Sequence, residues 1–240
     1  MPPHPSRRRL FLVLGAVLLV LAAVNVADKY GPHHTGLIAG PIVALALVLL
    51  ARRAGLTWHD LGLSKRTLVP GLKYAVGAIG VVAIVYAVGV ALPLTRPVFH
   101  DVRYHLHLSA ALLTAFIVVP LGTVLLEEVA FRGVLLGLVR RHRSATWASI
   151  TSSVLFGLWH ILPSLRLNHA NQAIGAALGT NVLGGVLTVA CVVAFTAVAG
   201  ALLNELRRRS GSLLASAGLH WATNGMGLLV AATLATVRFA

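Results

Sequence analysis

Acidic side chains are scarce in this sequence of 240 residues, which has six aspartates and glutamates against twenty lysines and arginines. Charged residues of both signs make up only 11% of the chain, while hydrophobic residues make up 58%. A soluble domain carries roughly 25% charged residues. The composition therefore excludes an ordinary soluble protein and indicates an integral membrane protein, which we expect to be one all-α domain over residues 1–240.

Cysteine is also nearly absent, because Cys191 is the single one in the chain. One cysteine excludes an internal disulfide, and its apolar surroundings, VLTVACVVAF, predict a packing residue. The sequence also lacks internal repeats and any linker between domains. These absences favour a single bundle over a modular protein.

The sequence contains several long apolar runs. A helix needs ~17–25 residues to cross a bilayer. Runs of suitable composition lie near 10–27, 36–51, 69–92, 109–139, 144–162, 179–203 and 212–237. The second run is short and contains Pro41, so it departs most from the pattern of a membrane span. We predict a polytopic bundle of about seven to eight transmembrane helices.

The basic residues are distributed unevenly between the two sides of this predicted bundle. With the N-terminus in the cytoplasm, fourteen of the twenty fall on the cytoplasmic side, including Arg7–Arg9 and Arg207–Arg209. Five fall on the other side, and Arg132 lies within the membrane. Cytoplasmic loops are enriched in Lys and Arg, so we expect a multi-pass plasma-membrane protein with its N-terminus in the cytoplasm. The Arg- and Ala-rich composition suggests a bacterium, which would make this its inner membrane. The net charge of +14 then reflects orientation and contact with anionic lipid, and no nucleic-acid partner is expected.

The first run has a second interpretation. Arg7–Arg9 followed by an apolar run also resembles an export signal of the twin-arginine kind. The remaining runs keep their orientation in either case.

Two adjacent carboxylates, Glu127 and Glu128, lie inside the apolar run TAFIVVPLGTVLLEEVAFRGVLLGLV. An ionisable group at membrane depth costs ~3 kcal/mol, so a function is the default interpretation. On a helix, residues four apart share a face and neighbours diverge by ~100°. Glu128 is therefore expected to pair with Arg132, leaving Glu127 available as a general base. The alternative is a self-neutralising Glu128–Arg132 pair beside a protonated, hydrogen-bonded Glu127.

The same run contains Pro120, seven residues before Glu127. Proline frees a backbone carbonyl and can kink a helix. A bent helix beside the carboxylates would suit a water-filled cavity, and simple packing accommodation would explain it equally well.

Histidines occur in two later apolar runs. Phe156 and His160 are four residues apart, so both face one side of a helix. His220 and Asn224 have the same spacing, beside the small residue Gly218, which permits close packing. Without a functional role, His160 would be a residue at the membrane interface, and His220 and Asn224 would form hydrogen bonds between helices.

Depth in the membrane links the three segments. Counted from the nearest basic turns at ~1.5 Å per residue, Glu127, His160 and His220 lie roughly 21, 26 and 16 Å deep. Since long helices protrude, these values say only that the three side chains could meet at one level.

The three motifs together carry a family resemblance. EEVAFR matches the pattern EExxxR, FGLWH matches FxxxH, and HWATN matches a final HxxxN/D motif. In this order, each on a predicted span, they resemble the CPBP family, which comprises type II CAAX prenyl endopeptidases and bacterial relatives tied to bacteriocin processing and immunity. The resemblance covers roughly residues 109–230, which would form the catalytic core.

The resemblance implies an intramembrane endopeptidase that cleaves a membrane-associated peptide or protein. The implied site residues are Glu127, Glu128, Arg132, His160, His220 and Asn224. Glu127 would activate water with support from Glu128 and Arg132. The other three would bind a metal or stabilise the oxyanion.

The resemblance leaves the metal open. A catalytic zinc takes three protein ligands and one open position, so Glu127, His160 and His220 form a tentative Zn²⁺ set, with Glu128 then the base. Without a metal, Glu127 would polarise water while His220 and Asn224 donate to the oxyanion. We prefer Glu127 as the base.

Two other classes of protein fit the same residues. A non-enzymatic immunity or scaffold protein of this fold would have an identical sequence pattern. A transporter also places carboxylates and histidines in a bundle, but it favours repeated halves with broken helices, which this sequence lacks. Because bacteria generally lack prenylated CAAX proteins, a prenyl substrate need not apply.

Overall fold

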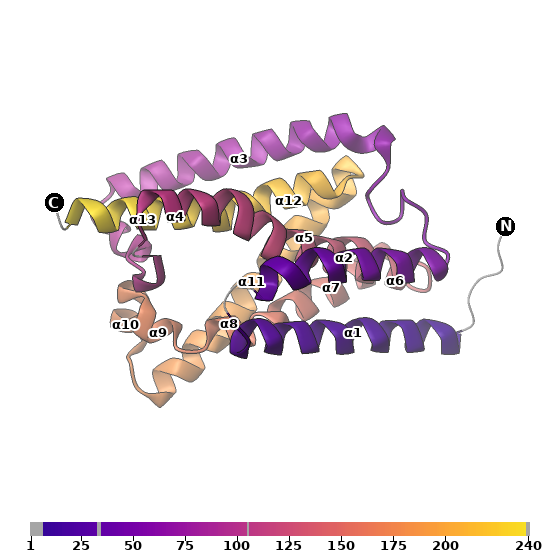
Figure 1. Cartoon of the computed structure of the whole chain (residues 1–240), viewed down its shortest axis with the longest axis horizontal. Helices are drawn as coiled ribbons and strands as arrows, with labels where there is room; N and C mark the ends of the chain where they lie inside the picture. The colour runs from indigo at the N-terminus through magenta and orange to yellow at the C-terminus, as the bar shows by residue number, and fades with distance from the viewer. Residues whose placement is uncertain (1–6, 33–34, 105, 239–240) are drawn as a thin grey trace.

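The computed structural model describes residues 7–32, 35–104 and 106–238, and within these ranges the chain is overwhelmingly helical (Figure 1). Strand pairing in these ranges is limited to one isolated bridge between Asp101 and Asn171. The long helices are α1 (Arg7–Tyr30), α2 (Thr35–Arg53), α3 (Leu68–Ala91), α7 (Ala145–Trp159) and α11 (Val182–Ser210). Short segments between them are η1 (Lys65–Thr67), η2 (Arg96–Phe99), η3 (Val102–Tyr104), α8 (Ile161–Ser164), α9 (Leu167–Ala170) and α10 (Gln172–Leu178).

Two further helical runs are divided into segments. The first consists of α4 (Leu108–Leu113), η4 (Thr114–Val124), α5 (Leu125–Glu127), η5 (Glu128–Leu135) and α6 (Leu136–Arg140). The second consists of α12 (Leu213–Trp221), η6 (Ala222–Met226) and α13 (Gly227–Arg238). Within the described residues, six helices are long and apolar enough to span a membrane, and the run from α12 to α13 is not among them. An all-α polytopic bundle is thereby confirmed, with six spans by this measure against the seven to eight expected.

The expected distortion at Pro120 takes the form of a wide, π-helical turn. Pro120 lies in η4, and the amide of Leu125 donates to the Pro120 carbonyl, five residues back. The segments η5 and η6 are π-helical as well. Such turns are rare and often occur at functional sites. In this protein, η5 begins at Glu128 and η6 contains Asn224.

The basic segments meet at one end of the bundle. Buried Arg207 of α11 donates to the carbonyls of His59 and Asp60, both at 3.0 Å. Arg141 lies 3.4 Å from the Asp60 carboxylate. Burial acts to raise the pKa of Asp60, but hydrogen bonds from Thr57 and the charge of Arg141 hold the pKa below its usual value. We call this end, formed by residues 54–64, 141–144 and 207–211, the basic end.

Close helix contacts surround the carboxylate-bearing run. An added Cβ on Gly218 of α12 would lie 2.6 Å from the Cβ of Ala75 in α3, and one on Gly40 of α2 would lie 2.6 Å from the carbonyl of Leu121. Small residues of this kind let helix backbones approach closely in membranes. In Figure 1, α3 runs along α12 and α13 on one side of the molecule. Residues of η5 are all buried, so the carboxylates lie at the centre of the bundle.

Candidate functional site

A cavity of about 650 Å³ opens beside the carboxylate pair. Glu127 at the end of α5, His160 after α7 and Asn224 in η6 all line it. These residues come from three segments that are far apart in the sequence. The cavity therefore gathers one residue from each of the three motifs.

The two oxygens of Glu127 have different surroundings. Oε1 accepts a hydrogen bond from the indole nitrogen of Trp159 at 2.9 Å. Oε2 is buried and has no hydrogen-bond partner among the described residues, and it lies 3.6 Å from Nε2 of His220. One oxygen is thus fixed by a hydrogen bond, while the lone pairs of the other accept no hydrogen bond from the described residues.

Glu128 is held from two sides and does not line the cavity. Its Oε1 lies 3.3 Å from Nη1 of Arg132, four residues along, and 2.9 Å from Nδ1 of His220. Arg132 is fully buried, and its ion pair with Glu128 lacks the alignment of a hydrogen bond. The expected Glu128–Arg132 pairing is therefore present, with His220 as an unforeseen third member.

Phe156 is the aromatic centre of the site. The guanidinium carbon of Arg132 lies 3.9 Å from the centroid of its ring. Its ring also meets those of His160 and His220 edge-on, at centroid distances of 4.6 and 5.7 Å. The shared face expected for Phe156 and His160 is confirmed. Because a desolvated cation over an aromatic face gains about 2 kcal/mol, Phe156 helps to offset the burial of Arg132.

The tautomer of His160 follows from its hydrogen bond. Its Nδ1 lies 2.7 Å from the carbonyl oxygen of Phe156. A carbonyl only accepts, so Nδ1 must carry the proton, and the neutral ring then has its lone pair on Nε2. His160 lines the cavity with a ring that can accept a hydrogen bond or take up a proton.

Asn224 is exposed to the cavity, and the chain around it is anchored on both sides. The indole of Trp221 donates to the carbonyl of Ala115 in η4 at 2.7 Å. The hydroxyl of Tyr86 in α3 donates to the carbonyl of Thr223 at 2.7 Å. These bonds fix the π-helical turn that presents the amide.

The structure thus divides the six predicted residues into two groups. Glu127, His160 and Asn224 line the cavity, whereas the cluster of Glu128, Arg132 and His220 packs behind them. The sequence reasoning did not identify Trp159, which holds Glu127. Its only signal was its position next to His160, since nothing in a sequence reveals where an indole N–H points.

The tentative zinc set is not assembled in this arrangement. Among the described residues, no group of three or more His, Cys, Asp or Glu lies close enough to hold a metal ion. Nε2 of His220 and Oε2 of Glu127 face each other at 3.6 Å, but Nδ1 of His220 is taken by Glu128, and His160 adds no third ligand to them. The residues present do not fit a three-ligand zinc, and no step below uses one.

The segment that carries these residues matches a known protein family. Residues 109–226 match the family model described as type II CAAX prenyl endopeptidase Rce1-like. The matched segment contains all six predicted residues, and it is an Rce1-like domain of the CAAX-type intramembrane protease family. The protein is accordingly a polytopic membrane protein that contains a segment similar to a protease family. No curated protein and no solved structure matches the chain.

Proposed function

We propose that this protein is an intramembrane endopeptidase in which Glu127 activates the attacking water. The observation that carries the proposal is the free Oε2 of Glu127, buried beside a cavity that His160 and Asn224 also line. A general base needs a lone pair within reach of a water and a fixed orientation. The Trp159 bond to Oε1 supplies that orientation.

The steps follow from the groups that face the cavity. Glu127 takes a proton from water as the water oxygen bonds to the scissile carbonyl carbon. The amide of Asn224 donates to the oxyanion that develops. The C–N bond then breaks, and the proton held by Glu127 passes to the leaving nitrogen. His160, with Nε2 free, accepts a hydrogen bond from the water and keeps it in the cavity.

His220 takes a different role from the oxyanion donor expected of it. It is 4% exposed and does not line the cavity, and it contacts both glutamates. Glu128, which is paired with Arg132, holds its ring in place. We therefore assign His220, Glu128 and Arg132 to positioning Glu127, and Asn224 alone to the oxyanion.

The charge of the residues that line the cavity limits which residues can flank the cleaved bond of the substrate. Its lining contains Asp28, Asp101 and Glu127 but no Lys or Arg within the part of the chain that the structure describes. Arg103 neutralises Asp101 at 2.7 Å. A free carboxylate would find no cation here, so we infer cleavage of a membrane-associated chain at a bond whose neighbours are uncharged or basic.

We place the protein in a bacterial inner membrane, with its N-terminus and basic end in the cytoplasm and its catalytic core at 109–230. The excess of basic residues on one side supports this orientation. Cleavage would then occur within the bilayer, in the cavity beside Glu127.

The decisive experiment measures cleavage of a library of membrane-tethered peptides by the purified protein. We expect Glu127→Gln, which keeps the size of the side chain, to lower cleavage at least 100-fold, because general-base catalysis contributes 10²–10⁴-fold. His160→Gln, in the cavity, is tested in the same assay. Its control is His169→Gln, at an exposed histidine that does not line the cavity. Equal cleavage by wild type and Glu127→Gln, or no cleavage by either, would sink the proposal and favour a non-enzymatic immunity or scaffold protein.

Metal analysis of the same preparations tests the zinc set separately. We expect wild type and the double variant His160→Ala, His220→Ala to contain equal metal, since the ligands do not converge. One zinc per chain in the wild type and none in the variant would restore the metal site and make Glu128 the candidate base.

A further inference from the structure

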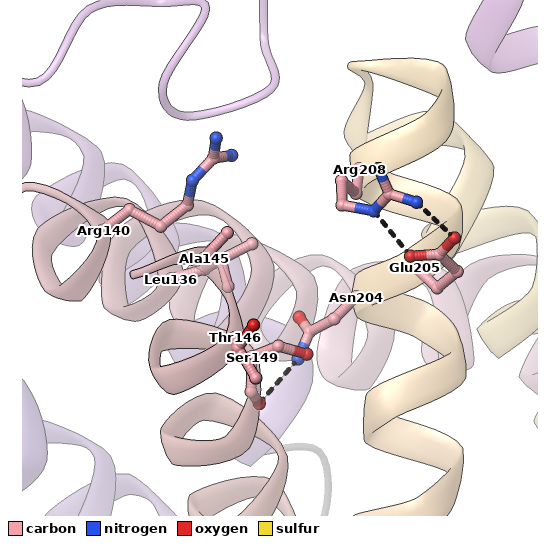
Figure 2. Close-up of a pocket in the computed structure, with 8 residues that line it drawn as sticks. All are labelled: Leu136, Arg140, Ala145, Thr146, Ser149, Asn204, Glu205 and Arg208. Carbon is pink, nitrogen blue, oxygen red and sulfur yellow. Dashed lines mark hydrogen bonds and ion pairs between the residues drawn. The ribbon is translucent and has the colours of Figure 1, made fainter. Parts of the chain in front are cut away.

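A second cavity, of about 260 Å³, lies at the basic end, away from Glu127. It lies between the junction of α6 and α7 on one side and the end of α11 on the other (Figure 2). Arg140 stands on one wall, and Arg208 with Glu205 stands on the other (Figure 2). Thr146 and Asn204 lie between them, deeper in the cavity.

Three features of this cavity favour an anion. The side chain of Arg140 is exposed and makes no hydrogen bond or ion pair with the rest of the described chain. The first amides of α7, those of Ala145 and Thr146, have no carbonyl partner within their helix, and a helix N-terminus attracts negative charge. Glu205 is paired with both Arg208 and Arg209, each at 2.6 Å, so the carboxylate is already neutralised and positive charge is in excess around the cavity.

Asn204 adds an independent requirement on the ligand. It is 2% exposed, and its amide nitrogen donates to the carbonyl of Ser149 at 3.2 Å and to the hydroxyl of Ser153 at 3.1 Å. These bonds fix the orientation of the amide. Its Oδ1 is buried and has no partner among the described residues. A buried acceptor of this kind is unfavourable until a donor reaches it.

We propose that this cavity binds the headgroup of an anionic phospholipid that carries hydroxyl donors, of the phosphatidylglycerol class. The phosphodiester contacts Arg140, the hydroxyl of Thr146 and the free amides of α7, while a glycerol hydroxyl donates to Oδ1 of Asn204. The negative charge of the phosphodiester is attracted by the excess of positive charge around the cavity. A phosphatidylethanolamine headgroup has no net charge and would bring its ammonium next to two arginines. The location at a helix end suits a headgroup whose acyl chains remain in the bilayer.

The test uses the delipidated full chain in a neutral detergent, with bound lipid counted by native mass spectrometry. Phosphatidylglycerol is expected to bind at least tenfold more tightly than phosphatidylcholine of the same acyl chains. Phosphatidic acid, which has the phosphate but no glycerol hydroxyls, is expected to bind more weakly than phosphatidylglycerol. Equal binding of phosphatidylglycerol and either other lipid overturns the proposal.

The double variant Arg140→Gln, Thr146→Val is expected to reduce phosphatidylglycerol binding to the level of phosphatidylcholine. Arg143→Gln removes an equally exposed arginine from the same turn without touching the cavity, and it is expected to bind as wild type does. Wild-type binding by the double variant overturns the site. Displacement of the lipid by inorganic phosphate at equal concentration would show a free-anion site and overturn the lipid assignment. Neither experiment depends on peptidase activity.

Discussion

At the residue scale, the two neighbouring glutamates differ in what contacts them. Glu128 contacts Arg132 and His220 through one oxygen. Glu127 accepts a hydrogen bond from Trp159 through Oε1, while its Oε2 has no hydrogen-bond partner among the described residues and lies 3.6 Å from Nε2 of His220. Two carboxylates in one apolar run can thus have separate roles. The cost of burying them is offset by a guanidinium, an imidazole and an indole.

Removing the indole donor tests how Glu127 is oriented. Trp159→Phe keeps an aromatic ring but deletes the hydrogen bond to Oε1. A hydrogen bond to a charged group contributes about 1.5–3 kcal/mol, so we expect peptide cleavage to fall about tenfold or more. Trp147→Phe, at a tryptophan that is 60% exposed, should leave the rate unchanged. Equal rates for the two variants would contradict an orienting role for Trp159.

Phe156 is expected to matter chiefly for stability. Phe156→Leu removes the ring beneath the Arg132 guanidinium and its edge contacts with two histidines. We expect the free energy of unfolding to drop by about 2–3 kcal/mol, seen as a lower melting temperature in detergent. Phe195→Leu, at a side chain that is 74% exposed, is the matched control and should melt close to wild type. Identical melting of the two variants would refute the role assigned to Phe156.

At the element scale, π-helical turns set which side chains reach the cavity. The segment η5 begins at Glu128, directly after Glu127, and η6 begins two residues after His220 and contains Asn224. Hydrogen bonds to the fifth residue shift the faces of a helix relative to those of a regular α-helix. This accounts for a finding that the four-residue spacing did not predict, namely that Asn224 lines the cavity and His220 does not.

Close packing of α12 on α3 is the second element-scale feature. Gly218→Ala would place a methyl group 2.6 Å from the Cβ of Ala75, so the two helices must separate. We expect a destabilisation of about 1–3 kcal/mol, as for overpacked cores. Gly77→Ala in α3 meets no atom within 4 Å. There alanine should stabilise by up to ~1 kcal/mol through helix propensity. Thermal melting that moved the same way in both variants would contradict this packing.

At the scale of the whole molecule, the two ends of the bundle differ in charge. Arg141 and Arg207 hold the connection 54–64 against α6 and α11 at the basic end, and the cavity lined by Arg140 and Asn204 lies at the same end. The cavity lined by Glu127 lies within the bundle, beside the buried run 128–139. The proposed headgroup site and the proposed reaction site are therefore separate cavities at different levels of the molecule.

The orientation can be tested with single cysteines in a Cys191→Ser background. Leu94, which is 91% exposed, follows α3 at the end opposite the basic end, and Arg143 lies at the basic end. We expect Leu94→Cys to react with a membrane-impermeant maleimide on intact cells. Arg143→Cys should react only after lysis. The reverse pattern would place the N-terminus outside.

Much of the fold could be predicted because hydrophobic length alone identifies a membrane helix. The runs expected at 69–92 and 109–139 correspond to α3 at Leu68–Ala91 and to the described run Leu108–Arg140. The pairing of Glu128 with Arg132 was also predictable, since it is local to one helical turn. The contacts of Trp159 were not, because they depend on how one helix is rotated against another.

The sequence by itself determined that this is a helical membrane protein with carboxylates and histidines at compatible depths. These properties follow from composition and from spacing along single helices. Only the tertiary structure decided that His220 lies behind Glu127, that Asn224 lines the cavity and that Asn204 has an oxygen without a partner in the described part of the chain. Those facts depend on helix rotation and π-helical turns, which arise from packing between segments more than 50 residues apart.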